Sequence, residues 1–303
     1  MDFRHLESFA AVAKARSFSK AAEMLFLTQP TISNHISHLE GEMNALLINR
    51  SNKRITLTPA GELLLRHVLV ILNERDQALF DLEQYKGEIT GTLDIASSST
   101  PERYLLTELL CAFSARYPSV RFNLMRLDSK QVLDRLLSGE IDFGIVGSRS
   151  DSKNQLIFTE IGQDEVVLVG PTEGSLSRIA SLTPQELPKQ RLLLRESGSG
   201  TRSTVENRLA ELGVLPEQLQ VAATMENTET IKDAVNKGMG LAFISARAAE
   251  QDLAQGRLRL IPVEGLHISR SFYFVYHKHM LLSPLSERFR LFILEAFGQP
   301  QQL

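Results

Sequence analysis

Two short apolar-faced segments joined by only three residues constrain the start of this 303-residue chain more than any other feature. Apolar residues recur at helical spacing, with Ala21, Ala22 and Leu25 in the first segment and Ile32, Ile36, Leu39 and Met43 in the second. The intervening Phe26–Thr28 leaves room for a tight turn, and the small alanines let two helices approach closely. The pattern therefore predicts a helix-turn-helix. Thr28 would cap its second helix, and Pro30 would lie in the first turn.

A β-wing is expected to follow this helix pair. Turn-forming residues after Arg50 precede the alternating Ile55 and Leu57, which indicates short strands. We therefore assign residues 1–58 to an all-α winged helix-turn-helix domain.

A long helix is expected to begin at Thr58 and Pro59 and to run to about Lys86. Leucines recur along it every seven residues, at Leu65, Leu72 and Leu79. This stripe is typical of a helix that pairs with a second helix, and burial in a core is the alternative interpretation. We assign residues 59–88 to a dimerisation linker helix and expect a homodimer.

From Gly91 onward strands alternate with helices, which predicts an α/β fold with parallel sheet covered on both faces. The first set of strands comprises TLDIAS, VRFNLMRL and DFGIVG, and the second comprises EVVLVG, RLLLRE, QVAATM, LAFIS and LRLIPV. The chain closes with SFYFVYHK and a helix from Pro284.

Composition bounds the function only weakly. Residues 1–66 contain 8 Lys and Arg against 6 Asp and Glu, so charge alone does not indicate a nucleic-acid partner. The N-terminus lacks a basic start followed by an apolar run, and no stretch reaches the roughly 18 apolar residues of a membrane span. We expect a cytoplasmic protein without a membrane partner. Cys111 is the single cysteine, and its apolar neighbours favour core packing over a redox role.

The block SFSKAAEMLFLTQPTISNHISHLE, followed by Asn49-Arg50 and ITLTPAGELLL, resembles the LysR-type transcriptional regulators. The resemblance extends over essentially the whole chain. It implies a winged helix-turn-helix, a long linker helix and, over residues 91–303, a two-lobed effector domain like periplasmic binding proteins. Lobe 1 would cover about 91–164 and 267–303, and lobe 2 about 165–266. The implied partners are double-stranded promoter DNA, a small effector and further copies of the chain, as a dimer or a homotetramer.

DNA contacts are expected from two groups of residues. The amides of Gln29 and Asn34 can pair with adenine edges, and Thr31 can meet a thymine methyl. Their neighbours complete the reading face, namely Pro30, Ser33, His35, Ser37 and His38. Family members commonly have arginine at the positions of Asn34 and Ser37, but here no Lys or Arg occurs between Lys20 and Arg50. Phosphate contacts are therefore expected from residues around this face, namely Arg50, Lys53 and Arg54 on the wing with Arg16 and Lys20.

Two hydroxyl-rich segments predict a site for an anionic effector between the lobes. Ser97–Thr100 and Ser197–Thr201 each follow a strand and open a helix, where free N–H groups and the helix dipole favour negative charge. The residues expected around the effector are Ser98, Ser99, Thr100, Gly147, Ser148, Ser197, Ser199, Gly200, Thr201, Arg202, Asn227 and Thr228. Helix caps and turns are the alternative. The segment RESGSGTR resembles regulators of sulfur and carbon assimilation, which implies a sulfur oxyanion or a small carboxylate.

The sequence disfavours two other classes of protein. A two-lobed solute-binding protein without a regulatory role should carry a secretion signal and has no use for residues 1–58. An enzyme is disfavoured because Gly198–Thr201 lacks the lysine and spacing of a phosphate loop, and neither a GxSxG nor an HExxH motif occurs. His35 and His38 lack a third donor at metal-ligand spacing. We expect no catalytic residue, metal or cofactor.

Overall fold

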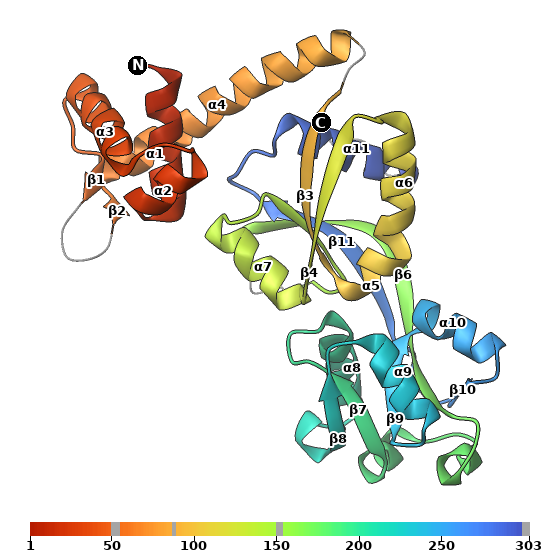
Figure 1. Ribbon diagram of the computed structural model, residues 1–303. Coiled ribbons are helices and arrows are strands. Elements are labelled where there is room, and N and C mark those ends of the chain that lie inside the picture. The colour runs from red at the N-terminus through yellow and green to blue at the C-terminus, as the bar shows by residue number, and fades with distance from the viewer. Residues whose placement is uncertain (50–54, 87–88, 150–153, 299–303) are drawn as a thin grey trace. The chain divides into compact units, whose positions relative to one another are not determined.

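The computed structural model describes residues 1–49, 55–86, 89–149 and 154–298 (Figure 1). These residues divide into two compact units. The first is built on Met1–Gly91 with His277–Arg288, and the second contains the remainder.

The first unit contains the expected winged helix-turn-helix. Its helices are α1 (Phe3–Ala15), α2 (Phe18–Met24) and α3 (Gln29–Met43), and its wing strands are β1 (Ile48–Asn49) and β2 (Thr56–Leu57), which pair antiparallel. The side chains of Asp2, Ser17 and Thr28 each accept a hydrogen bond from the first turn of the helix that follows. The predicted helix-turn-helix and wing are therefore confirmed.

The long helix α4 (Pro59–Tyr85) follows the wing, as expected. Val68 is buried, and Leu65 and Leu72 pack partly buried against the apolar core of the helix-turn-helix. The seven-residue stripe therefore serves the chain's own core over part of its length, which the sequence interpretation did not foresee. The large apolar side chains that α4 leaves exposed are Leu63, Val70, Leu79, Leu82 and Tyr85. Dimerisation through α4 stays a prediction.

The second unit is built on a sheet with the strand order β4-β3-β5-β11-β6-β9-β7-β8, and β10 pairs with β6. The strands are β3 (Gly91–Ser98), β4 (Val120–Leu127), β5 (Phe143–Val146), β6 (Leu156–Pro171), β7 (Arg191–Arg195), β8 (Gln220–Met225), β9 (Leu241–Ser245), β10 (Leu258–Leu260) and β11 (Ser269–His277). The pairs β3–β5, β7–β8 and β7–β9 are parallel, whereas β5–β11 and β6–β9 are antiparallel.

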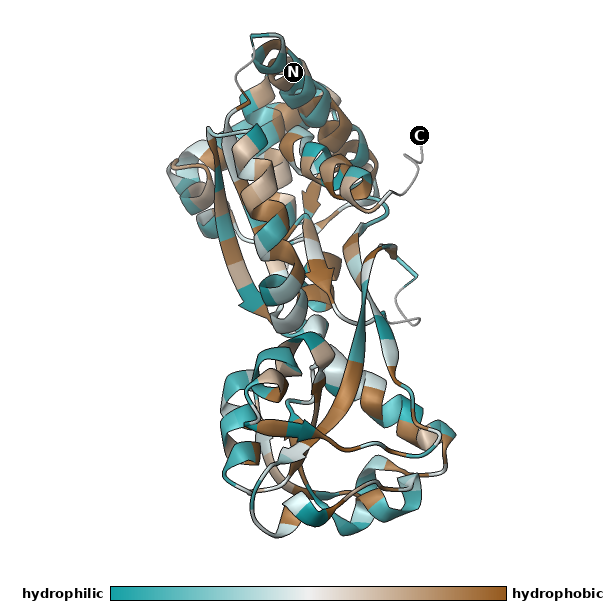
Figure 2. Ribbon diagram, turned by 90° about the vertical axis from the view of Figure 1, so that its right-hand side faces the viewer, coloured by the Kyte–Doolittle hydropathy of each residue, from teal (hydrophilic) through white to brown (hydrophobic). Residues whose placement is uncertain are grey.

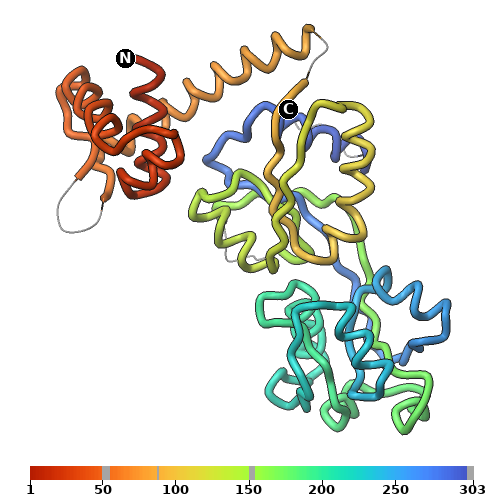
Figure 3. The backbone as a smooth tube through the Cα atoms, in the orientation of Figure 1, coloured from red at the N-terminus to blue at the C-terminus, as the bar shows by residue number. Residues whose placement is uncertain are grey.

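The expected parallel pairing is therefore present within each lobe, but the sheet as a whole is mixed. The chain crosses between the lobes along β6 and returns along β11, as the tube in Figure 3 shows. Each crossing strand runs against a neighbour in the lobe where it pairs, so the sheet is mixed.

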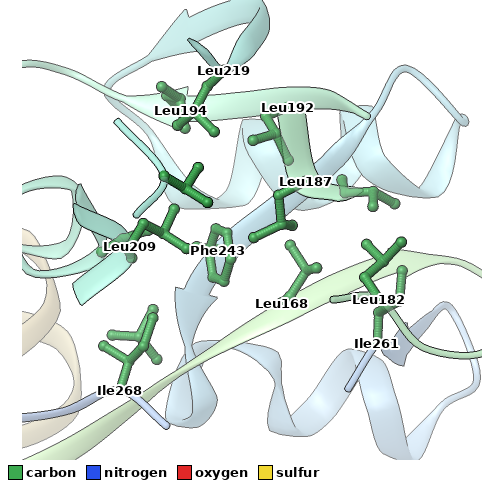
Figure 4. Packing of buried hydrophobic residues seen from close by; sticks show 14 residues of the cluster. Leu168, Leu182, Leu187, Leu192, Leu194, Leu209, Leu219, Phe243, Ile261 and Ile268 are labelled. Carbon is green, nitrogen blue, oxygen red and sulfur yellow. The ribbon is translucent and has the colours of Figure 1, made fainter. Parts of the chain in front are cut away.

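Helices cover the strands of this unit, and of α11 the part from Phe289 onward belongs to it. They are α5 (Ser99–Pro101), a π-helical segment (Glu102–Leu106), α6 (Thr107–Arg116), α7 (Ser129–Ser138), α8 (Gly200–Glu211), α9 (Thr228–Asn236), α10 (Ala246–Ala254) and α11 (Pro284–Ala296), with short 3-10 turns at Ser175–Arg178, Pro184–Lys189 and Pro216–Gln218. In lobe 1 the ring of Phe289 lies 5.1 Å from Phe113 and 6.0 Å from Phe143. Lobe 2 buries a separate leucine-rich cluster around Phe243 (Figure 4). Figure 2 shows the apolar residues following the strands of this lobe.

Cys111 contradicts the expectation of core packing, because its side chain is exposed. The buried residues of α6 are Leu109 and Phe113. Cys111 lies two positions from each, which at 3.6 residues per turn puts it on the opposite side of the helix.

Candidate functional site

Helix α3 exposes the polar face from which base contacts were expected. Ile32, Ile36 and Leu39 are buried against the helix-turn-helix core, and the polar residues between them face outward. Gln29, Pro30, Asn34, Ser37 and His38 are exposed, and Thr31 and Ser33 are half-buried. The Thr31 hydroxyl hydrogen-bonds the Thr28 hydroxyl at 2.8 Å, so part of its capacity is used in the cap. Arg50, Lys53 and Arg54 lie outside the described residues.

The histidines of α3 contact a histidine of α1. The ring of His38 stacks on that of His5 at 5.6 Å, and His35 lies 5.0 Å from His5. His35 Nδ1 also hydrogen-bonds the buried Ser8 hydroxyl at 2.7 Å. Burial, and then the neighbouring His5, lower the pKa of His35. Across the described residues, no group of three or more His, Cys, Asp or Glu side chains is arranged to hold a metal ion.

A small cavity of about 10 Å³ lies between the lobes, where the predicted effector segments meet. Predicted residues that line it are Ser98, Ser99, Thr100, Gly147, Ser199, Gly200 and Thr201. Residues that the sequence interpretation missed also line it, namely Asp128, Ser129, Arg195, Glu196 and Arg270. The serines that precede α5 and α8, Ser98 and Ser199, make no side-chain cap bond. Within the described ranges, neither N-cap side chain therefore accepts from the first turn that follows it.

Ser129 is the most informative of the missed residues. Ser129 is 3% exposed, and its hydroxyl has no hydrogen-bond partner among the described residues. A Cβ atom at Gly200 would lie 2.8 Å from this hydroxyl and 2.8 Å from that of Ser148, so a larger residue would require one or both hydroxyls to move. Gly200 thus leaves space at the start of α8, beside an unsatisfied donor on α7.

Two buried arginine side chains line the small cavity. Arg195 pairs with Glu196 at 2.8 Å and donates to Ser99 Oγ at 3.1 Å and to Thr228 Oγ1 at 3.2 Å. Arg270 pairs with Asp164 at 2.7 Å and donates to Thr201 Oγ1 at 2.7 Å. Because each arginine already has a carboxylate partner, the cavity offers hydrogen-bond donors more than unpaired charge.

A larger cavity of about 230 Å³ adjoins the first through Ser99 and Thr100. Its other lining residues are Arg103, Tyr104, Arg126, Glu226, Asn227, Thr228 and Glu229. Arg103 bonds Glu229 at 2.8 Å across the two lobes. The Asn227 side chain accepts a hydrogen bond from the Glu229 N–H at 2.8 Å. Asn227 therefore caps α9, which is the alternative role expected for such residues.

Three predicted effector residues do not line either cavity. Ser197 is exposed, and Ser148 approaches only through its contact with the Gly200 position. Arg202 turns back along α8, where Glu206 binds its Nε at 2.7 Å and the Arg195 carbonyl accepts from Nη1 at 3.1 Å. The i,i+4 spacing of Arg202 and Glu206 favours this pair over a contact with the cavity.

The missed residues carried signals in the sequence. Asp128-Ser129 follows a strand and opens a helix, the same pattern that identified the two hydroxyl-rich segments. Arg195 ends β7 directly after three leucines, and Arg270 lies near the start of β11, before its aromatic residues. Both arginines are buried, and a buried charge requires a partner.

Comparison with known proteins identifies both parts of the chain. Residues 3–62 match the model of the bacterial regulatory helix-turn-helix proteins of the lysR family, and residues 86–298 match the LysR substrate binding domain. The HTH-type transcriptional regulator CbbR of Rhodospirillum rubrum is 34% identical over 97% of this chain and 96% of its own. A probable RuBisCO transcriptional regulator of Porphyra purpurea is 32% identical over 98% of this chain and 94% of its own.

Solved structures share the fold. A full-length OxyR variant from Pseudomonas aeruginosa superimposes with a TM-score of 0.66 at 21% identity, covering 98% of this chain and 97% of that one. The effector binding domain of QuiR in complex with shikimate gives 0.61 at 18% identity, covering 69% of this chain and 98% of that one. The architecture is thus a helix-turn-helix followed by a two-lobed α/β effector domain. None of the helices in the described ranges is long and apolar enough to cross a membrane.

Proposed function

Because the chain belongs to the LysR family of transcriptional regulators, which bind DNA and are not enzymes, we propose that a small anion held between its lobes modulates promoter binding. A two-lobed solute-binding protein without a regulatory role would not need the helix-turn-helix of residues 3–62. A partner that is chromosomal DNA implies a cytoplasmic location.

The observation that carries the anion proposal is the unpartnered hydroxyl of Ser129. A buried hydroxyl without a partner is unfavourable by about 1–3 kcal/mol, and a bound acceptor would remove this penalty. The uncapped first turns at Ser98 and Ser199 supply further donors around the same cavity. Negative charge is favoured there by the helix dipoles.

The class of anion follows from the donors and the space. Hydroxyls, backbone N–H groups and already paired arginines suit a compact acceptor such as a sulfur oxyanion or a small carboxylate. The QuiR domain binds shikimate, a carboxylate, which supports this class. A volume of about 10 Å³ holds about one water, so an anion requires Arg195 to release Ser99 or the lobes to part.

A thermal-shift panel tests the proposal on the full chain, with sulfite, sulfate, thiosulfate, phosphate and small carboxylates. We expect at least one anion to raise the melting temperature of the wild type and of Ser138→Ala, a matched serine at the exposed end of α7. The same anion should give a smaller shift in Ser129→Ala and Ser99→Ala. Equal shifts in all four proteins, or no shift with any anion, would refute the site.

A second measurement connects the site to regulation. The anion that stabilises the wild type should change the affinity of the chain for a DNA duplex selected from a random library. The change should be lost in Ser129→Ala and kept in Ser138→Ala. An anion that binds without altering DNA affinity would argue against effector control.

A further inference from the structure

The turn between α2 and α3 contains an aromatic residue in an unfavourable backbone conformation. Phe26 has φ of 54°, in the left-handed region. Helix α2 ends there in a Schellman motif, in which the N–H of Leu27 donates to Ala22 O at 2.9 Å and the N–H of Phe26 donates to Glu23 O at 3.3 Å. Glycine usually occupies this position because it has no Cβ to clash. The fold alone would therefore favour glycine over phenylalanine.

The side chain of Phe26 does not compensate by packing. It is 97% exposed, the highest value of any large apolar side chain in the described residues, whereas Phe9 in the same unit is fully buried. The neighbouring Met24 and Leu27 are 48% and 41% exposed, so the turn presents a small apolar patch. Both the backbone conformation and the exposed ring are unfavourable in the isolated chain. Strain of this kind is concentrated at functional sites.

The position of the ring identifies its partner. Phe26 lies two residues before Thr28, the N-cap of α3, and three before the exposed Gln29. In helix-turn-helix proteins the N-terminal residues of the second helix reach the base edges in the major groove. The apolar patch is thus continuous with the reading face of α3. Phenylalanine is one of the side chains that pack against the C5-methyl of thymine.

We propose that Phe26 is a specificity-determining residue whose ring packs on the methyl group of a thymine at the edge of the half-site read by α3. The proposal rests on α3 being the DNA-reading helix of the proposed regulator. It adds an apolar contact to a reading face that is otherwise polar and lacks arginine.

The test uses the full chain and a duplex that the wild type selects from a random-sequence library. Each thymine is replaced singly by uracil, which removes only the methyl group. At one position per half-site, uracil should weaken wild-type binding about fourfold, the effect expected for one buried methyl. Because a two-fold protein carries Phe26 in both copies, Phe26→Ala should bind the thymine duplex about as weakly as the wild type binds a duplex with uracil at that position in both half-sites, and it should not respond to uracil there. A uracil effect of equal size in both proteins would overturn the proposal.

A second variant separates recognition from folding. Phe26→Gly should raise the melting temperature of the free chain, because glycine suits the left-handed position, and should weaken binding to the selected duplex. A purely structural role would move both quantities in the same direction, which would contradict the proposal. Unchanged DNA binding by Phe26→Ala with loss of transcriptional activation would also overturn it, because the ring would then contact a protein.

Gln29→Ala separates the proposed thymine contact from the assignment of α3 as the reading helix. If Gln29→Ala loses discrimination and Phe26→Ala does not, only the thymine contact is refuted. If both variants discriminate like the wild type, the assignment of α3 as the reading helix fails as well.

Discussion

Arg270 on β11 and Asp164 on β6 form a buried ion pair, in which Nε and Nη2 donate to one carboxylate oxygen at 2.9 and 2.7 Å. The guanidinium is 4% exposed and the carboxylate is fully buried. Ser245 donates to the other carboxylate oxygen at 2.8 Å, and the third nitrogen of Arg270 reaches Thr201 at the start of α8. The pair therefore connects the two strands that cross between the lobes to the wall of the proposed effector site.

Removing one partner of this pair should be strongly destabilising, because the other charge stays buried without compensation. We expect Asp164→Ala to lower the free energy of unfolding of the effector domain by about 3–5 kcal/mol in urea titrations. Glu211→Ala is the matched control, since Glu211 pairs with Arg208 on the surface of α8 and such pairs contribute about 0–1 kcal/mol. Similar losses in the two variants would show that the buried pair has no special role.

The elements of this fold could be predicted because their signals are local. Thr28, Pro30 and the apolar spacing of α3 specify a capped helix without reference to the rest of the chain. The direction of β6 and β11 could not be predicted, because strand pairing depends on which lobe a segment enters. A local pattern carries no such information.

The candidate site shows the same limit. The hydroxyls at Ser99 and Thr201 could be placed at helix starts, and the structure brings them to one cavity. The arginines that bond them could not be identified, because Arg195 reaches Ser99 across 96 residues of sequence. Arg202 does not line this cavity, because its nearby partner Glu206 binds it along the same helix, and its place in the effector site stays a prediction.

Self-association should depend on the exposed apolar side chains of α4. Leu79 and Leu82 are 56% and 58% exposed, whereas Leu72 packs against the core of the helix-turn-helix. We expect glutamate at positions 79 and 82 together to shift sedimentation toward the monomer and to weaken operator binding, since a two-fold protein reads two half-sites. Leu72→Glu is the contrasting control and should instead lower the melting temperature of the DNA-binding unit. Unchanged sedimentation of the Leu79→Glu, Leu82→Glu double variant would exclude self-association through these side chains of α4.

Stability of the DNA-binding unit should fall with pH through His35. Burial lowers the pKa of its ring in the folded chain, with His5 the next cause and Arg4 and His38 acting in the same direction against Asp2. The unfolded chain therefore takes up a proton first, near the ordinary histidine pKa of about 6.5. The stability due to the neutral ring is complete above that pH and is lost as the pH falls through the folded pKa.

Urea midpoints measured between about pH 7.5 and 5 check this expectation. The wild type should lose more stability over this range than His35→Gln, whose amide can still bond the Ser8 hydroxyl. His67→Gln, a change at an exposed histidine of α4, should behave like the wild type. Parallel pH profiles for all three proteins would mean that His35 does not titrate differently on folding.

Binding titrations at several salt concentrations should distinguish the residues that read bases from those that contact phosphates. We expect Gln29→Ala and Asn34→Ala to lower the preference for operator over random DNA, because each good bidentate contact is worth roughly 1–3 kcal/mol of discrimination. Arg50→Ala and Arg54→Ala should weaken binding to both duplexes about equally, and the salt slope should flatten by about one unit for each phosphate that is no longer neutralised. Because α3 presents exposed amides and has no arginine of its own, the two effects should be distributed over different residues. If Gln29→Ala weakens operator and random DNA to the same extent, its amide does not read a base.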